Sequence, residues 1–231
     1  MTQKPAFQDR NALAFIAALA VTATLAGCGE PASSDDTADQ KVAVESEPSQ
    51  PAPRATTAPA ITQVVEKERT ITAPFGSVQI AQVSIENAAH AEAGRLHITY
   101  FDKDGEQSAD YPKAVVMGSW GRMGEWSTEQ KYSEFPVIVA EGGGTWQGYT
   151  CGWTSWTELQ PSGPVELLRL QTFYSNDGTG REPEEFEATI GSPAPDGSFV
   201  VSFAGTKERS TKYRREGDAY IAVSGEELDA C

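Results

Sequence analysis

From about residue 64 to the end of the chain, apolar and polar residues alternate in short runs that are separated by turn signals. Leu96, Ile98 and Tyr100 alternate with polar neighbours, and the same period of two recurs at 185–190 and 198–203. Successive side chains of a strand point to opposite faces, so each run has one face for a core and one for water. No long run has the 3.6-residue period of a helix. The pattern predicts an all-β, mainly antiparallel fold, a β-sandwich or small barrel with at most one short helix.

The connections between these runs support the strand prediction. Asp104-Gly105, Asp177-Gly178 and Asp196-Gly197 are dipeptides typical of hairpin turns. Within 78–85 the alternation changes phase, which predicts a β-bulge, and the alanine-rich segment 86–92 is the candidate for the short helix. Further strands are expected at 114–117, 135–140, 145–159 (with or without a break), 165–174, 211–215 and 220–224.

The N-terminus carries the pattern of an export signal. Lys4 and Arg10 precede an apolar run at 12–24, which is shorter than the roughly 20 residues that a helix needs to cross a bilayer. Such a run suits the core of a secretory signal. The tetrapeptide Leu25-Ala26-Gly27-Cys28 follows directly and resembles the processing box of bacterial lipoproteins. The alternatives are a plain secretory signal with an unrelated cysteine, or a transmembrane anchor.

The resemblance to lipoproteins covers about the first 28 residues and implies an address for the protein. It implies cleavage before Cys28, a diacylglyceryl group on the sulfur, and acylation, for example with palmitate, of the new amino end. Each buried CH₂ group contributes about 0.8 kcal/mol, so three chains would hold the protein to a lipid bilayer. Gly29 rather than aspartate follows the cysteine, which in this family favours the outer membrane. We therefore expect a lipid-anchored outer-membrane protein that faces the periplasm.

The sequence divides into three segments. Residues 1–27 are the expected lipoprotein signal peptide, and 66–231 are expected to form a single β-rich domain. Between them, 28–65 is rich in proline, alanine and acidic residues, and no aromatic residue occurs from 30 to 69. A segment of this composition cannot bury enough apolar surface to offset its ordering entropy. We therefore predict a disordered linker there.

Charge limits the partners. The formal net charge is −15, so the phosphate backbone would repel the chain and we predict no nucleic-acid partner. A basic cluster at 207–215 is expected either to pair across the sheet with Glu185 and Glu187, or to contact an anionic envelope polymer.

Two cysteines remain after lipidation of Cys28. In an exported chain, Cys151 and Cys231 are expected to form a disulfide, because the compartment is oxidising. The alternative is one buried thiol and one exposed reactive thiol. No Cys-x-x-Cys motif suggests a redox function.

No catalytic motif is present. The chain has no Gly-x-Ser-x-Gly, Ser-x-x-Lys or His-Glu-x-x-His sequence, so we assign no catalytic residue and no cofactor. Gly142-Gly143-Gly144 lacks the lysine of a phosphate loop and is expected to be a turn.

We likewise predict no metal site. His90 and His97 are seven residues apart, which is not a familiar zinc spacing, although they could join Asp102 or Asp104 around a metal. The segment 102–106 partly resembles a calcium loop but lacks its spacing, and a hairpin turn is favoured.

An aromatic cluster beside Cys151 is the most distinctive feature of the domain. It comprises Trp146, Tyr149, Trp153 and Trp156. In one continuous strand, Tyr149 and Trp153 would share a face with Cys151, and Trp146 and Trp156 would take the other. One interpretation is that the rings pack the core and cover the disulfide. The other is that one face stays exposed, joined by Trp120 and Trp126, and binds a sugar or a partner.

Three functions remain open. The missing motifs favour a non-catalytic interaction or accessory lipoprotein with an envelope protein as its partner. The second is a cell-wall or glycan-binding module that uses the aromatic cluster. The third is a hydrolase whose site the sequence does not reveal.

Overall fold

The computed structural model describes residues 62–228 and 230–231. The predicted signal peptide, most of the predicted linker, and Cys28 lie outside these residues. The described part contains twelve strands and one 3₁₀ turn, η1 (Asp177–Thr179), and no α-helix. The strands are β1 (Thr62–Ala73), β2 (Gly76–Glu86), β3 (Gly94–Phe101), β4 (Gln107–Met117), β5 (Trp126–Glu129), β6 (Val137–Trp146), β7 (Tyr149–Gln160), β8 (Gly163–Ser175), β9 (Glu185–Ile190), β10 (Phe199–Gly205), β11 (Arg209–Glu216) and β12 (Ala219–Ser224).

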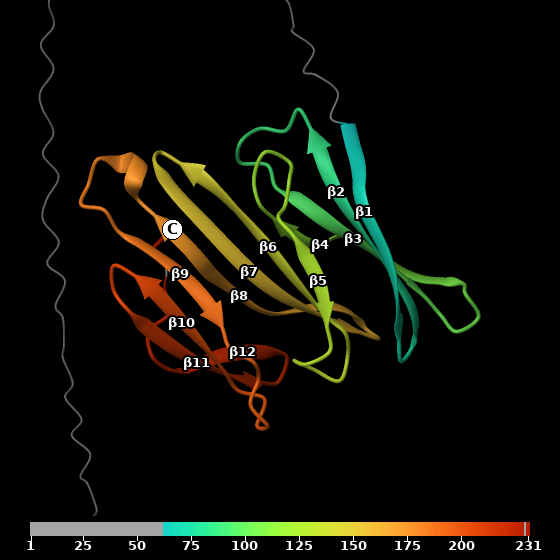
Figure 1. The fold of residues 1–231 in the computed structure, drawn as a ribbon. Helices are drawn as coiled ribbons and strands as arrows, with labels where there is room; N and C mark the ends of the chain where they lie inside the picture. Colours follow the sequence, from blue (N-terminus) through green and yellow to red (C-terminus); the bar gives the residue numbers. More distant parts are fainter. Residues whose placement is uncertain (1–61, 229) are drawn as a thin grey trace, which may run out of the picture. The chain divides into compact units, whose positions relative to one another are not determined.

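The strands form two antiparallel sheets in which neighbours in the sheet are also neighbours in the sequence (Figure 1). The first sheet has four strands in the order β1-β2-β3-β4, and the second has eight in the order β12-β11-β10-β9-β8-β7-β6-β5. The predicted all-β antiparallel class is confirmed. Strand β1 begins at Thr62, so residues 62–65, which composition assigned to the linker, belong to the first sheet.

The first core lies between the four-stranded sheet and the β5–β7 part of the second sheet (Figure 1). Val78, Ile80, Leu96, Ile98 and Tyr100 supply it from β2 and β3, and none of them is more than 1 % exposed. Ile138, Ala140 and Leu159 supply it from the second sheet. The apolar faces of β2 and β3, which their alternating sequences predicted, therefore pack against the second sheet.

The second core belongs to the eight-stranded sheet alone, because strands β8 and β12 approach each other as the sheet curls. It is built largely from aromatic rings: Tyr132, Trp156, Tyr174, Phe186, Phe199, Phe203, Tyr213 and Tyr220. Edge-to-face, stacked and tilted ring pairs at centroid distances of 5.0–6.1 Å connect many of them.

The C-terminal segment after β12 returns over this core. Leu228 packs against the core, and the Thr211 hydroxyl donates to the carbonyl oxygen of Glu226. The predicted disulfide Cys151–Cys231 is present, with Cα atoms 6.4 Å apart and a sequence separation of 80. The last residue is thus attached to β7.

Two local predictions are corrected by the fold. The phase change in β2 does not mark a bulge there, because residues 82–85 are buried on both faces of the strand. The register shift lies in the partner strand β1, between Val65 and Lys67. The segment 86–92 is not a helix: Glu86 ends β2 and 87–92 is a loop, in which Asn87 has a left-handed φ of 58° and the carbonyls of His90 and Glu92 accept bonds from the 120–121 turn.

Two other turn predictions have opposite outcomes. The hairpin at 102–106 is confirmed, and its Asp102 carboxylate accepts the backbone N–H groups of Asp104 and Glu106. Gly142-Gly143-Gly144 was expected to be a turn and instead lies within β6. Glycine is needed there because a Cβ on Gly142 would lie 2.6 Å from the backbone nitrogen of Gly118 in the loop after β4.

Candidate functional site

A tight hairpin between β6 and β7 positions the aromatic cluster. The strand prediction at 145–159 allowed a break, and the break is here: Gln147 and Gly148 have φ values of 51° and 88°, which suits a two-residue hairpin turn. Trp146 and Tyr149 therefore pair directly across the hairpin, and Trp153 pairs with Gly142. Directly opposed residues of antiparallel strands share a face.

The four predicted site residues divide differently from the expectation. Trp146 shares its face with Tyr149 and Trp153, whereas a continuous strand had placed it opposite them. Trp156 lies on the other face as expected and is 1 % exposed in the second core, so it offers no surface to a ligand. Trp126 is also buried, with its indole N–H donated to Gln82 at 3.0 Å.

An exposed stack of rings extends from this hairpin. We call it the aromatic ridge, and it consists of Trp120, His90 and Trp146. The His90 imidazole lies between the two indoles, with centroid distances of 4.7 Å to Trp120 and 5.5 Å to Trp146. Trp120 is 59 % exposed, whereas His90 and Trp146 are half-buried. The ridge thus joins three separate loops or strand ends.

The backbone holds Trp120 outward at a conformational cost. Its φ of 54° lies in the left-handed region, which a bulky side chain rarely adopts. The Trp120 N–H donates to the His90 carbonyl at 3.2 Å, and the neighbouring Ser119 hydroxyl donates to the Gly143 carbonyl at 3.0 Å. Strained residues of this kind persist only where surrounding contacts fix them, and they gather at functional sites.

A cleft adjoins the ridge on the other side of Trp146. We call it the hairpin cleft; its volume is about 510 Å³, and it is lined by Trp146, Tyr149, Trp153, Tyr174, Arg181 and the Cys151–Cys231 disulfide. The guanidinium of Arg181 lies 5.7 Å from the ring centroid of Tyr149. Rings and one cation therefore form the walls.

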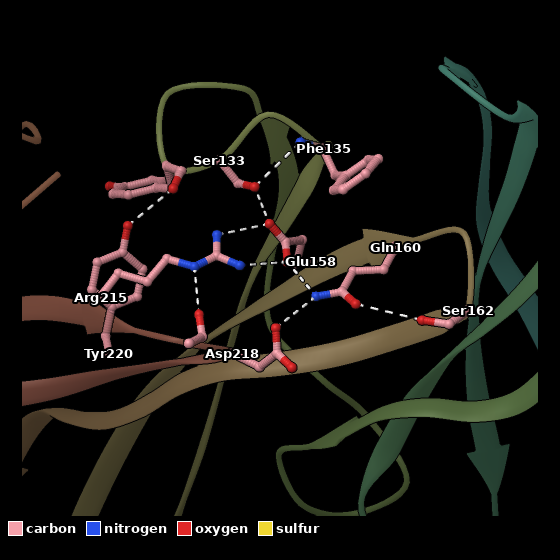
Figure 2. Close-up of polar contacts among 10 residues, drawn as sticks. Ser133, Phe135, Glu158, Gln160, Ser162, Arg215, Asp218 and Tyr220 are labelled. Carbon is pink, nitrogen blue, oxygen red and sulfur yellow. Dashed lines mark hydrogen bonds and ion pairs between the residues drawn. The ribbon is translucent and has the colours of Figure 1, made fainter.

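A second polar arrangement lies buried at a different part of the sheet (Figure 2). We call it the carboxylate clamp, and its centre is Glu158 of β7, which is 1 % exposed. Arg215 of β11 donates to both oxygens of Glu158, each at 2.8 Å. The Ser133 hydroxyl donates to Oε1, and the Gln160 amide donates to Oε2 at 2.7 Å. The hydrogen bond to Glu158 raises the pKa of Arg215.

The clamp is a closing device and not a reactive acid. A carboxylate has about four lone-pair sites, and the four donors occupy all of them. Next to it, the Tyr220 hydroxyl donates to the carbonyl of Tyr132 at 3.0 Å, and Arg215 Nε donates to that of Gly217 at 2.9 Å. These bonds join β7, β11, β12 and the loop before β6 (Figure 2). They therefore connect strands from separate parts of the curled sheet.

The structure does not bring the two histidines together. His90 belongs to the ridge, whereas His97 Nε2 lies 2.7 Å from the Asp110 carboxylate on the exposed face of β3 and β4. Among the described residues no group of three or more metal-ligating side chains is found. No helix in the described part of the chain is both long and apolar enough to cross a membrane.

The basic cluster has other partners than those expected. Arg215 binds Glu158, Arg214 binds Glu216 at 2.6 Å, and Lys212 lies 4.0 Å from Asp196. Within residues 62–228 and 230–231, no ion pair joins the cluster to Glu185 or Glu187. Those two glutamates sit on β9, where β10 separates them from β11.

The sequence did not predict several members of these sites, among them His90 in the ridge, Arg181 in the cleft and Glu158 in the clamp. His90 and Arg181 have no local signal, because each reaches its aromatic partner through a loop. Glu158 lies between Thr157 and Leu159 in a mostly polar stretch of β7, so its neighbours in the sequence did not indicate its burial.

Comparison with known proteins adds no family: a scan against protein-family models, a search of curated proteins and a search of solved structures each return no match.

Proposed function

We propose that this chain is a lipid-anchored, non-catalytic module of the outer membrane, facing the periplasm, which holds a cell-wall glycan on the aromatic ridge. The observation that carries the proposal is the exposed Trp120 ring, held in a left-handed backbone conformation and stacked on His90. Folding alone gains little from such an arrangement, because the ring remains largely in water.

Sugars suit this surface chemically. The C–H groups on one face of a sugar ring are apolar and pack on an aromatic face, while the hydroxyls around the edge remain hydrated. The net charge of −15 disfavours polyanions and does not affect an uncharged glycan. An anchor at Cys28 would keep the ridge close to the cell wall, because a linker of about 35–40 residues has a limited reach.

The hydrogen bonding of Glu158 in the clamp supports a non-catalytic function. Glycoside hydrolysis uses two carboxyl groups, one of them often in an apolar pocket, with room for the substrate between them. Glu158 is the one charged side chain among the buried polar residues of the described part, and protein donors saturate it.

Co-sedimentation of the purified mature lipoprotein with isolated peptidoglycan sacculi tests the binding. We expect Trp120→Ala to weaken binding at least about tenfold, equivalent to about 1.4 kcal/mol. The matched control is Val116→Ala, which truncates another exposed apolar side chain on β4, outside the ridge. Equal binding by Trp120→Ala and wild type would overturn the ridge as the contact surface. Absence of wild-type binding to sacculi, with an envelope protein captured instead, would favour the accessory-protein function.

The anchor has its own test. In cells, Cys28→Ala should abolish incorporation of labelled palmitate and release the protein from the outer-membrane fraction. Retention of the variant in that fraction would contradict attachment through Cys28 and leave the ridge experiment unaffected.

A further inference from the structure

We propose that the hairpin cleft is a second subsite, which takes one uncharged sugar unit of the same glycan strand. This rests on the proposed function, and it deepens it by naming the ligand: an uncharged oligosaccharide long enough to pass over Trp146 from ridge to cleft. Trp146 belongs to both surfaces, since it stacks on His90 on one side and lines the cleft on the other.

The cleft is built by two loops that are bonded to each other. The N–H of Gly178 donates to the carbonyl of Gly148 at 3.2 Å, which joins the tip of the β6–β7 hairpin to the 176–184 loop. The fit is close, because a Cβ on Gly148 would lie 2.4 Å from the backbone of Gly178. The two walls of the cleft are therefore held at a fixed separation.

Buried Asn176 organises the loop that carries Arg181. Its side-chain amide donates to the carbonyl of Glu182 at 2.9 Å, and its side-chain oxygen accepts the N–H of Glu184 at 2.7 Å. The Thr179 hydroxyl donates to the carbonyl of Asn176 at 2.8 Å and accepts the N–H of Arg181 at 3.2 Å. The loop thus has a defined conformation, and it presents the guanidinium over the Tyr149 ring.

The rings of the cleft offer a surface for one sugar face. Tyr149 stacks on Tyr174 with centroids 6.2 Å apart, and Trp153 meets Trp146 edge to face at 5.9 Å. Tyr149, Trp146 and Trp153 are all half-buried, so part of each ring remains open to the cleft. The arrangement combines aromatic rings with a few placed polar groups, as small-ligand sites generally do.

Arg181 supplies the polar contact. Its side chain is exposed and forms no ion pair within the described part of the chain. A guanidinium presents several N–H donors in a rigid fork, which can bind sugar hydroxyls while the plane stacks on an aromatic ring.

The charges around the cleft select against acidic sugars. Glu182 and Glu184 both follow Arg181 in the sequence. Burial raises the pKa of Tyr174 in the cleft wall, and the charge of Glu184 acts on its hydroxyl and raises that pKa further. A carboxylated sugar would meet these acids together with the single cation, whereas an uncharged sugar avoids the repulsion.

Titration of the purified mature lipoprotein with chito-oligosaccharides of increasing length tests the subsite, with calorimetry as the readout. We expect wild-type affinity to rise at least about tenfold from the disaccharide to the hexasaccharide. Arg181→Ala and Tyr149→Ala should remove most of that rise with oligosaccharide length. Trp120→Ala should weaken binding at every length. Carboxylated oligogalacturonides of equal length should bind more weakly than the uncharged series.

The outcomes separate the two proposals. If Arg181→Ala and Tyr149→Ala keep the full dependence on length, or if the carboxylated series binds more tightly, the cleft proposal is overturned while ridge binding to sacculi stands. If wild type binds sacculi through Trp120 but its affinity does not change with oligosaccharide length, the cleft proposal is again overturned. If the wild-type protein does not bind sacculi at all, the proposed function itself is overturned.

Discussion

The carboxylate clamp and the aromatic ridge lie in different parts of the molecule and expose their side chains to solvent to opposite degrees. In the clamp, Glu158 is 1 % exposed and every lone pair has a donor within the protein. On the ridge, Trp120 is 59 % exposed and stacks on His90, so most of its ring surface remains in water.

The difference shows where this protein stabilises itself and where it can bind. A buried charge whose partners are all internal closes the curled sheet, and nothing remains for a ligand to satisfy. An exposed ring held in a strained backbone conformation does little for closure and retains an apolar surface that a ligand can cover. The comparison is testable, because changes at the clamp should affect stability and changes at the ridge should affect binding.

Breaking the clamp should give the largest effect. Glu158→Gln keeps the shape of the side chain and removes its charge. The guanidinium of Arg215 then has no ion-pair partner at this buried position. We expect a loss of about 3–5 kcal/mol in unfolding free energy, measured by urea denaturation. The double variant Glu158→Leu/Arg215→Met removes both charges and should cost clearly less. A double variant as unstable as the single one would contradict this account of the clamp.

Removing the disulfide, which lies near the ridge, should lower the unfolding free energy by an amount comparable to that of Glu158→Gln. Cys231→Ser should cost about 4 kcal/mol, because the closed loop has 80 residues and the unfolded chain gains entropy when it opens. Cys151→Ser and the double serine variant should show the same loss, since all three remove one bond. Unequal losses among the three, in non-reducing thermal or urea denaturation, would show that a cysteine side chain contributes through packing as well.

Adding one methyl group beneath the ridge should affect both properties. A Cβ on Gly144 would lie 2.6 Å from the ring of Trp146, so Gly144→Ala must displace the indole. We expect a stability loss of about 1–3 kcal/mol and weaker binding to sacculi. The cycle with Trp146→Ala supplies the control: in that background Gly144→Ala should cost far less. If Gly144→Ala lowered the unfolding free energy equally in both backgrounds, the loss would come from the backbone and not from contact with the Trp146 ring.

The smallest effect on stability is expected at an exposed carboxylate, Asp110. Asp110 accepts bonds from His97 and Thr99, and these lower its pKa below the ordinary 3.8. The contribution of ionised Asp110 to folding stability is therefore fully present at pH values above the ordinary pKa of 3.8. It is lost as the pH falls through the lowered pKa of the folded state. Since the side chain is 41 % exposed, solvent screening limits Asp110→Asn to a few tenths of a kcal/mol.

Denaturation at pH 7 and in acid checks the prediction for Asp110. The difference between wild type and Asp110→Asn should be present at pH 7 and should vanish in acid, with Asp104→Asn as the exposed control. A loss as large as that of Glu158→Gln would contradict the view that burial, and not the number of bonds, sets the cost.

Much of the fold follows from local pattern. The alternating runs at 95–100, 185–190 and 198–203 became β3, β9 and β10 because alternation gives a strand one face for a core. Where both faces are buried, as at 82–85, alternation fails as a guide and suggested a bulge in the wrong strand. The glycines at 142–144 suggested a turn because their need for close backbone approach is a property of the neighbouring loop.

The sequence by itself determined the strand class, the hairpin at 102–106 and the pairing of Cys151 with Cys231, because period, turn chemistry and cysteine count are local or compositional properties. Only the tertiary structure decided that Trp156 is core while Trp120 is surface, that His90 lies between two indoles, and that Arg215 neutralises Glu158. Each of these depends on which strands curl toward each other and which loops meet. Burial and pairing are sums over distant segments, so no short stretch of sequence contains them.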